Sequence, residues 1–236
     1  MRNMKTILIT QAYNPQNQVR KEELALTLSK NVTNKDIDWI VLLVNEEVDY
    51  KIAAHPKVKI IRIESRPRYS DLFENINLYK EEKCNKRDCL LITANSDIYF
   101  HEDAISQMKH EISDDTVMIL SRWDHTRNGL VHFNRMDSQD VWAVKNRYKP
   151  GDYDIIQGVL GCDNRIAAEL KKAGYTLSNP SLDIKSIHYH YEQYNTYSDT
   201  PTVLGEYAFI HPHPMRKKWK RRRSNEEKKA IKKRRY

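Results

Sequence analysis

The segment CLLITANSDIYF, residues 89–100, places a carboxylate at the end of an apolar run. Cys89–Thr93 is apolar enough for a buried strand, and the polar cluster Asn95, Ser96 and Asp97 follows before apolar residues resume. Mg²⁺ and Mn²⁺ prefer oxygen ligands and bind through one or two carboxylates together with substrate phosphates. The carboxylate therefore suits a divalent cation that holds a diphosphate, and a hydrogen-bonding Asn-Ser-Asp turn is the competing interpretation.

A second group of reactive side chains lies in GVLGCDNRIAAELKKAGYTLSNPSLDIKSIHYH, residues 158–190. Asp163 follows glycines at the start of a helical pattern, where the helix dipole stabilises an anion. Such a carboxylate can act as a general base toward an acceptor hydroxyl, and an N-cap without chemistry is the alternative. His188 and His190 alternate on an expected strand, so both face the same side. Packing or solvent exposure is the alternative for each histidine.

Strands and helices alternate in the first half of the chain and must position these side chains. Apolar patterns predict strands at residues 5–10, 37–44, 57–63, 89–93 and 117–120. Helical patterns fall at 19–32, at 70–82 with Ser70 as a candidate N-cap, and at 101–111. This alternation predicts a parallel sheet covered by helices. Ligands bind such sheets beyond the carboxyl ends of the strands, which is where Asp97 would lie.

The pattern is looser after residue 120. GLVHF (129–133), DVWAVK (140–145) and IKSIHYH (184–190) have the composition of strands. The segment that begins at Cys162 has helical periodicity, and Gly174 is its predicted stop.

The composition favours a soluble globular protein. Hydrophobic residues make up 39% of the chain and charged residues 31%, which is typical of a protein with a core. No apolar run approaches the length of a membrane span, and Ile7–Ile9 is too short for the core of a signal peptide. The three cysteines are odd in number and lack metal-binding spacing, which predicts a reduced, intracellular protein.

The net charge of +8 is concentrated in one segment. Residues 216–236 hold 13 Lys/Arg and two Glu, a net charge of +11, whereas the preceding 215 residues hold 27 Lys/Arg and 30 Asp/Glu, a net charge of −3. The high pI therefore reflects a basic tail on a slightly acidic domain. Such a tail could bind an anionic membrane surface, with Trp219 as an interfacial anchor, or nucleic acid, or neither.

The order of the motifs resembles a known family, the small nucleotide-sugar glycosyltransferases of GT-A fold that occur in bacteria and large algal viruses. The motifs are NSDIYF, SRW, SQDVW, GCDNRIA, AGY, NP and His-x-His. The resemblance covers about Lys5 to Tyr197 and is strongest from Leu90 to His190. It implies an α/β fold: a single GT-A domain, Rossmann-like, with a mostly parallel mixed sheet flanked by helices.

The resemblance also implies roles for the two polar groups. NSD would be a variant of the Asp-x-Asp motif, so that Asp97 ligates Mn²⁺ or Mg²⁺ at the diphosphate of a UDP- or GDP-sugar. His188 or His190 would complete the metal site, and Asp163 would be the catalytic base. The sequence departs from the usual motif at Asn95, which supplies an oxygen but lacks the charge of the aspartate common there.

Further side chains are candidates for contact with the donor. Arg66, Arg68 and Tyr69 lie in ESRPRYSDLF and are expected to bind phosphate or base, because arginine binds phosphate bidentately. Asn95 and Ser96 are expected to contact the donor as well. A solvated turn around the intervening proline is the competing interpretation of the arginine segment.

A last set is expected to contact the sugar or the acceptor. Arg122 and Trp123 follow the strand at 117–120, and Asp140 and Trp142 belong to SQDVW. Aromatic faces suit the C–H surfaces of a pyranose ring. Core packing is the alternative for both tryptophans.

Together these features predict a metal-dependent glycosyltransferase that acts on an acceptor hydroxyl of a glycan or glycolipid. We expect the domain at residues 1–200, a linker or C-terminal extension at 201–215, and the tail at 216–236. The expected location is the cytoplasm, with peripheral contact at the inner face of a membrane.

Two other functions would also account for parts of the sequence. The alternative is a nucleic-acid- or anionic-surface-binding protein whose tail binds while the domain is catalytically silent, and it is weakened because the basic charge lies outside the domain. A nucleotidyltransferase that makes sugar nucleotides usually has a glycine-rich loop after the first strand, and TQAYNPQNQ contains no glycine.

Overall fold

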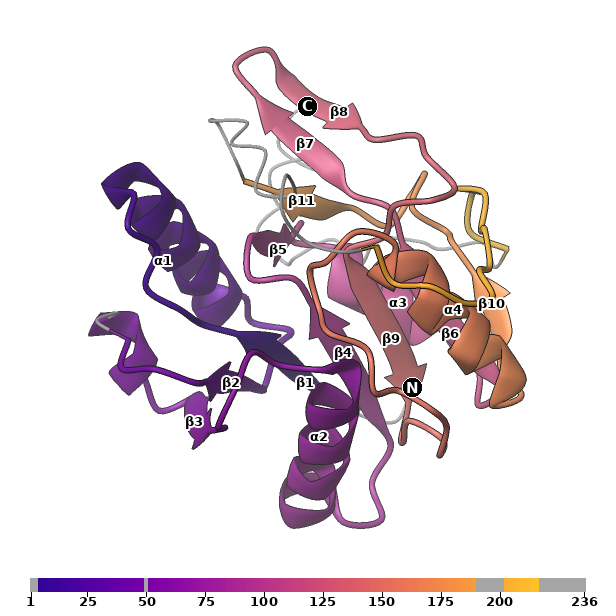
Figure 1. Ribbon diagram of the computed structural model, residues 1–236, viewed down its shortest axis with the longest axis horizontal. Coiled ribbons are helices and arrows are strands. Elements are labelled where there is room, and N and C mark those ends of the chain that lie inside the picture. The colour runs from indigo at the N-terminus through magenta and orange to yellow at the C-terminus, as the bar shows by residue number, and fades with distance from the viewer. Residues whose placement is uncertain (1–3, 49–50, 190–201, 217–236) are drawn as a thin grey trace, which may run out of the picture.

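A seven-stranded sheet forms the centre of the protein (Figure 1). The computed structural model describes residues 4–48, 51–189 and 202–216. The strands follow the order β10 (Thr176–Ser178), β6 (Thr116–Leu120), β9 (Val141–Lys145), β4 (Cys89–Ala94), β1 (Lys5–Gln11), β2 (Trp39–Val44) and β3 (Val58–Arg62). Strand β9 runs antiparallel to β4 and β6, and the other neighbouring strands pair in parallel. The mostly parallel mixed sheet predicted from the sequence is confirmed.

Helices cover both faces of this sheet. Helices α2 (Tyr69–Cys84) and α4 (Cys162–Lys172) pack in one hydrophobic core, and α1 (Gln18–Thr33) and α3 (Ala104–Glu111) pack in the other. Successive strand residues face opposite sides, so Ile7 and Ile9 of β1 join the first core and Leu8 joins the second. Because both faces are buried, the strands are continuous apolar runs, which is why the sequence revealed them.

Local interactions fix where the helices begin. The side chain of Asn17 accepts a hydrogen bond from the Arg20 backbone N–H and caps α1. At α2 the Asp71 carboxylate accepts from the Arg68 backbone N–H at 2.8 Å, so the cap is Arg68 and the Ser70 predicted for that position lies inside the helix. Gly174, the predicted stop after α4, has a φ of 85°, which favours glycine.

A second, smaller sheet lies beyond the carboxyl ends of the main strands. It contains β5 (Ile98–Phe100), β11 (Ser186–His188), β7 (Trp123–Thr126) and β8 (Gly129–His132), in that order. The sequence did not predict β5, β7 or β10, since strands of three or four residues carry little periodicity. In this sheet His188 lies opposite Ile98 on one side and Asp124 on the other. Three distant segments therefore meet directly after Asp97.

The remaining connections include a covalent link. A 3₁₀-helix, Lys51–Ala54, precedes β3. Cys84 at the end of α2 and Cys89 at the start of β4 form a disulfide, with their Cα atoms 6.8 Å apart. The expectation that all three cysteines are reduced is therefore wrong for this pair, since a short turn brings the two ends together. Cys162 is a free, buried thiol.

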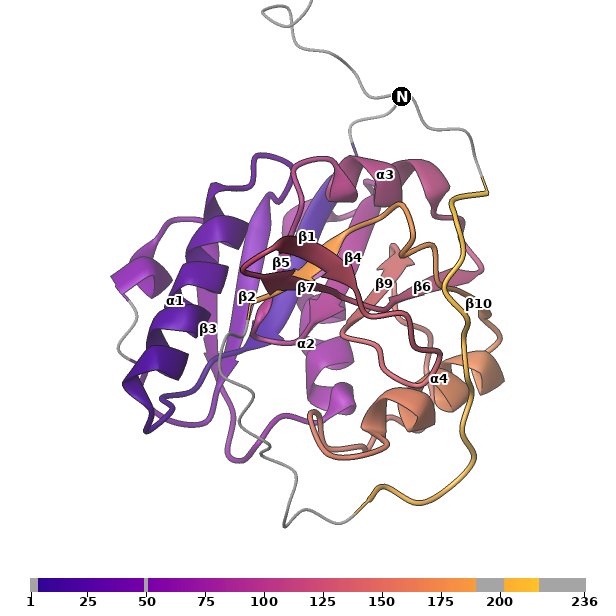
Figure 2. The ribbon, with the colours of Figure 1, turned by 90° about the horizontal axis from the view of Figure 1, so that it is seen from above.

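The C-terminal segment 202–216 lies against the domain (Figure 2). The Ala208 N–H donates to the Asn164 carbonyl of α4, and the His213 N–H donates to the Asn179 carbonyl. Ile210 is buried in the core between these points. The rest of the basic tail lies outside the described residues. No helix in the described ranges is long and apolar enough to cross a membrane.

The aromatic core generates a stability prediction. Trp142 is fully buried, its ring meets the Tyr69 ring edge-on with centroids 4.9 Å apart, and the Tyr148 hydroxyl donates to its carbonyl. We expect Trp142→Ala to lower the free energy of unfolding by about 3–5 kcal/mol, because truncation leaves a cavity. Leu78→Ala, at a side chain that is 69% exposed, should change it by less than about 0.5 kcal/mol. Urea denaturation measures both values, and equal losses would contradict the assignment of Trp142 to the core.

Candidate active site

The carboxyl ends of β4 and β6 meet the start of β9 at one edge of the main sheet. The Asn95 N–H donates to the Asp140 carbonyl at 3.0 Å, and the Asp140 N–H donates to the Leu120 carbonyl at 3.1 Å. The Asn95 side chain then donates to the Asp140 carboxylate at 2.9 Å and accepts from the Gln157 amide at 3.0 Å. Asn95 is therefore a junction that fixes Asp140 at this edge.

Asp97 follows Asn95 and is surrounded by positive charge. Its Oδ2 atom accepts from the Arg20 guanidinium at 2.6 Å and lies 3.2 Å from His188 Nε2. Burial alone would raise the pKa of Asp97, but His188 and Arg20 hold it well below the usual range of a carboxyl. Asp97 is therefore ionised and paired.

His188 bridges two carboxylates. Its Nε2 faces Asp97, and its Nδ1 lies 3.0 Å from Asp124 Oδ1. Burial lowers the pKa of His188, yet Asp97 and Asp124 together raise it to about 9. The ring is therefore an imidazolium at neutral pH, with both nitrogens as donors.

His188 is paired in the structure, and its predicted role as a metal ligand stays a prediction. A metal-binding histidine must be neutral and must offer a free nitrogen, and here both nitrogens face carboxylates. The other candidate, His190, lies outside the described residues.

Arg122 continues the network toward Asp140. Its Nε donates to Asp124 Oδ1 at 2.9 Å, and its Nη1 lies 3.6 Å from Asp140 Oδ2. The guanidinium also stacks on the Phe133 ring, 4.3 Å from the centroid. Acids and bases therefore alternate along the sheet edge, in the order Arg20, Asp97, His188, Asp124, Arg122 and Asp140.

Asp163 lies in the first turn of α4 and faces the same edge. Its carboxylate accepts from the Gln139 N–H at 3.3 Å and from the Cys162 thiol at 3.2 Å. Gly161, with a φ of 82°, is the N-cap, so Asp163 does not cap its own helix. Burial and the charge of Asp140 raise the pKa of Asp163 to about 7. A carboxyl group with such a pKa is suited to proton transfer near neutral pH.

Several predicted contacts are directed elsewhere. Tyr69 and Trp142 are fully buried in the core, so they do not reach a ligand at this edge. The Trp123 side chain donates to the Ser181 carbonyl at 2.8 Å, and it alternates with Asp124, so it faces away from the network. Core packing therefore accounts for Tyr69 and Trp142, whereas the contact of Trp123 with a sugar or an acceptor stays a prediction.

The two arginines predicted to bind phosphate hold a loop. Arg66 donates to the Gly158 carbonyl at 2.8 Å. Arg68 donates to the Asp154 carbonyl at 3.2 Å and pairs with the Asp154 carboxylate at 3.0 Å. Both side chains therefore attach the loop before α4 to the start of α2.

Three residues of the network were missed by the sequence analysis: Arg20, Asp124 and Gln157. Arg20 meets a partner 77 positions away, and Gln157 meets one 62 positions away, so no local pattern indicates either. Asp124 carried a signal, because it follows Arg122 and Trp123 directly after a predicted strand.

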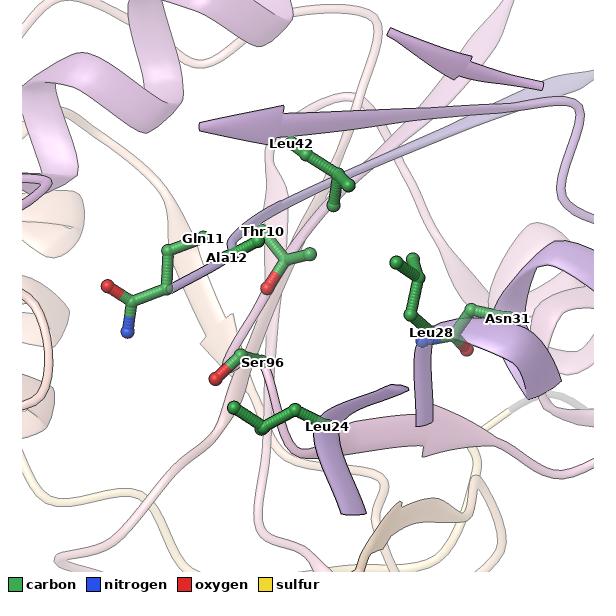
Figure 3. Close-up of a pocket in the computed structure, with 8 residues that line it drawn as sticks. All are labelled: Thr10, Gln11, Ala12, Leu24, Leu28, Asn31, Leu42 and Ser96. Atoms are coloured by element: carbon green, nitrogen blue, oxygen red, sulfur yellow. The ribbon is translucent and has the colours of Figure 1, made fainter. Parts of the chain in front are cut away.

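Ser96 lines a small hollow between β1, β2 and α1 (Figure 3). Apolar side chains of Leu24, Leu28 and Leu42 form much of the lining. The remaining lining residues are Thr10, Gln11, Ala12 and Asn31. The volume is about 10 Å³, which is enough for about one water molecule. A nucleobase does not fit this hollow.

The donor atoms at the edge fit the chemistry of a hard divalent cation. Carboxylates outnumber basic groups there, and Mg²⁺ and Mn²⁺ prefer oxygen ligands. Asp140 Oδ2 is buried and has no hydrogen-bond donor among the described residues. In those residues, however, no three His, Cys, Asp or Glu side chains are grouped as a metal site requires.

Comparisons with known proteins identify the fold. No protein-family model matches the chain, and a search of curated proteins finds no match. A mannosyltransferase from Pyrobaculum calidifontis, solved with GDP-Man and Mn²⁺, is similar to this protein, with 11% identity and a TM-score of 0.50. The match covers 80% of this chain and 58% of the mannosyltransferase chain. The chain has a GT-A-like, nucleotide-sugar transferase fold.

Two further solved structures are similar over parts of the chain. The match with a 4-diphosphocytidyl-2C-methyl-D-erythritol synthase covers 82% of this chain and 94% of the synthase chain, with 11% identity and a TM-score of 0.49. Residues 1–349 of S. aureus TarS match 57% of this chain and 40% of that chain, with 15% identity and a TM-score of 0.36.

The raised pKa of Asp163 predicts how stability depends on pH. The carboxyl has a pKa of about 7 in the folded protein against an ordinary value of 3.8. Its contribution to the free energy of unfolding is therefore fully present below the ordinary pKa of 3.8, and it is lost as the pH rises through the folded-state pKa of about 7. Asp163→Asn cannot ionise, so it should raise the melting temperature relative to wild type, by a few degrees at about pH 8 and by less at about pH 5.

The control is Asp152→Asn, a change at an exposed carboxylate. It should shift the melting temperature equally at both pH values. Thermal unfolding followed by circular dichroism makes the comparison. A lower melting temperature for Asp163→Asn at the higher pH would contradict the electrostatic assignment.

Proposed function

We propose that the chain is a glycosyltransferase that moves a sugar from a nucleotide-diphosphate donor to an acceptor hydroxyl of a glycan or glycolipid. The observation that carries the proposal is that Asp97 and Asp163 face the same edge of the sheet. Ion pairs through His188, Asp124 and Arg122 connect Asp97 with Asp140. Asp163 accepts from the N–H of Gln139, the residue before Asp140. This edge is where sheets of this kind bind their ligands.

Asp163 is the proposed catalytic base. The acceptor oxygen attacks the anomeric carbon of the donor, the bond from that carbon to the diphosphate breaks, and the hydroxyl proton moves to the Asp163 carboxylate. Hydrogen bonds from the Gln139 N–H and the Cys162 thiol orient that carboxylate. A pKa of about 7 lets a useful fraction of Asp163 be ionised before the step and still accept a proton during it.

The diphosphate gains negative charge as it leaves, and positive groups at the edge are proposed to stabilise it. Arg122 is one such group, held near Asp140 and Asp124. Asp97 and Asn95 would hold a Mn²⁺ or Mg²⁺ ion, which when bound supplies further charge to the diphosphate. The GDP-Man and Mn²⁺ in the similar mannosyltransferase support including GDP-sugars and Mn²⁺ in the tests.

Nucleotide binding and turnover test this proposal separately. UDP or GDP with Mn²⁺ should raise the melting temperature, and a panel of UDP- and GDP-sugars should identify the donor. Asp163→Asn should keep the nucleotide-induced shift and lose about 10²–10⁴-fold in turnover, because only the proton acceptor is removed. Wild-type turnover should rise with pH through about 7, as Asp163 ionises.

Asp152→Asn serves as the matched control, since it removes one exposed carboxylate and should retain wild-type turnover. If neither nucleotide shifts the melting temperature in the presence of the metal, the proposal is wrong. Normal turnover of Asp163→Asn would place the base at another residue.

We further propose that the basic tail contacts an anionic membrane surface, where a glycolipid acceptor would lie. Polybasic segments gain about 1 kcal/mol per basic residue near anionic lipid, and residues 217–236 hold 12 Lys/Arg. Co-sedimentation with phosphatidylserine vesicles should be lost on deletion of 217–236, whereas binding to neutral vesicles should be weak in both proteins. Tail-dependent binding to RNA with no binding to vesicles would favour a nucleic-acid partner instead.

A further inference from the structure

The Cys162 thiol contacts the carboxylate that the proposed function makes the catalytic base. Its Sγ atom lies 3.2 Å from Asp163 Oδ1, and the Gln139 N–H donates to Asp163 Oδ2 at 3.3 Å. The two donors belong to different segments, the start of α4 and the connection before β9. Because each carboxylate oxygen accepts one of them, rotation of the carboxylate would break both hydrogen bonds.

Tyr69 places its hydroxyl on the other side of the thiol. The Tyr69 oxygen lies 3.8 Å from Cys162 Sγ, and both side chains are buried. An ionised Asp163 can only accept, so the single proton of the thiol points to it, and the phenol is the donor to the sulfur. Tyr69 therefore donates to Cys162, and Cys162 donates to Asp163. Successive hydrogen bonds of this kind polarise one another inside a protein.

Both donors keep their protons at neutral pH. Burial raises the pKa of the Cys162 thiol and the pKa of the Tyr69 hydroxyl above their ordinary values. Cys162 is therefore a poor nucleophile, since the thiolate is the reactive form. What remains for this free, buried thiol is its capacity to donate.

The position of Tyr69 is fixed by groups outside the charged network. Its N–H donates to the Ile155 carbonyl at 2.9 Å, in the loop before α4. Its ring meets the Trp142 ring edge-on, with centroids 4.9 Å apart, and lies 5.8 Å from the Phe73 ring. Burial keeps Tyr69 from touching a ligand, but the same packing holds its hydroxyl in place beside Cys162.

Groups from three parts of the fold decide how easily Asp163 ionises. Burial and the charge of Asp140, just before β9, raise its pKa. The Cys162 thiol, the Gln139 N–H and the charge of Arg122, just after β6, lower it, and the thiol has the largest effect of these three. Loss of the thiol would therefore favour the neutral acid, which cannot accept a proton from an acceptor hydroxyl.

We propose that Tyr69 and Cys162 are positioning residues of the transferase, which together orient Asp163 and stabilise its ionised form. This inference rests on the proposed function, because it requires Asp163 to be the catalytic base. Tyr69 acts through Cys162, and Cys162 acts through Asp163. The proton of the acceptor still moves to the Asp163 carboxylate, and the protons of the thiol and the phenol stay where they are.

Removal of the thiol should displace the pH profile of the reaction. Without this donor Asp163 ionises at a higher pH, so the rise of turnover in Cys162→Ala should move up by about half a pH unit or more. Cys162→Ser keeps a donor and should return the rise toward its wild-type position. Tyr69→Phe should cause a smaller upward shift, because the thiol remains and only its polarisation is lost.

The test follows the titration of Asp163 and the turnover of the full chain. Carbon-13 NMR of protein labelled at aspartate measures the titration, and Asp163→Asn identifies the signal. Turnover is measured across the same pH range with the sugar nucleotide that the donor panel identifies. Thermal unfolding checks that each variant folds.

Tyr175→Phe is the matched control for Tyr69→Phe. Tyr175 is also a buried tyrosine, and its hydroxyl donates to the Arg147 carbonyl at 2.7 Å instead of to Cys162. Its loss should leave both the titration of Asp163 and the pH profile of turnover unchanged.

An upward shift in Cys162→Ala that Cys162→Ser reverses supports the proposal. An unchanged titration in Cys162→Ala overturns it, and so does an equal shift in the alanine and serine variants, which would reflect packing alone. An unchanged titration in Tyr69→Phe overturns the part assigned to Tyr69, and that variant decides the test if Cys162→Ala does not fold.

The two kinds of failure are distinguishable, because the NMR titration needs no turnover. Normal wild-type turnover with a titration that no variant moves would overturn this inference and leave the transferase standing. A wild type that transfers no sugar from any donor would refute the proposed function, and the role of Tyr69 and Cys162 in catalysis with it.

Discussion

The bridge of His188 between Asp97 and Asp124 is the interaction on which the arrangement of the site depends. The three residues belong to segments that follow β4, form β11 and form β7, and each segment is short. A strand of three residues makes too few backbone hydrogen bonds to hold its register alone. Ion pairs between an imidazolium and two carboxylates add charged hydrogen bonds at that register, each stronger than a neutral one. The small sheet and the charged network therefore stabilise each other.

The same bridge explains why the acids can lie so close together. Four carboxylates at one sheet edge would repel each other and become protonated if they were unpaired. Arg20, His188 and Arg122 separate Asp97, Asp124 and Asp140, and the pKa values of Asp97 and Asp124 are lowered as a result. Asp163 has no ion pair with a basic group among the described residues, and burial and the charge of Asp140 raise its pKa instead. One network thus contains a permanently ionised acid and an acid that can exchange a proton.

Much of the main sheet could be predicted from the sequence because its strands are buried on both faces. Continuous apolar runs such as Cys89–Thr93 are typical of strands that are buried on both faces. The topology then places the residues after β4 at the carboxyl edge of the sheet, so the position of Asp97 was predictable without any partner. Its partner Arg20 was not, since 77 positions separate the two residues. His188, 91 positions away, was placed beside Asp97 only by the resemblance, and as a metal ligand. The two tryptophans were hard to assign, because Trp142 lies in a strand of the main sheet buried on both faces and Trp123 in a short strand of the small sheet. The local sequence does not distinguish these positions.

The amide at residue 95 can now be understood from its neighbours. Asn95 donates to Asp140 Oδ1 at 2.9 Å and accepts from Gln157 at 3.0 Å, a combination that a carboxylate cannot provide because it has no donor. An ionised aspartate there would instead face the buried Asp140 carboxylate at hydrogen-bond distance, and like charges that close favour protonation of one of them. With an amide at residue 95, the Asp140 carboxylate, whose pKa burial raises, keeps a hydrogen-bond donor at this edge of the sheet.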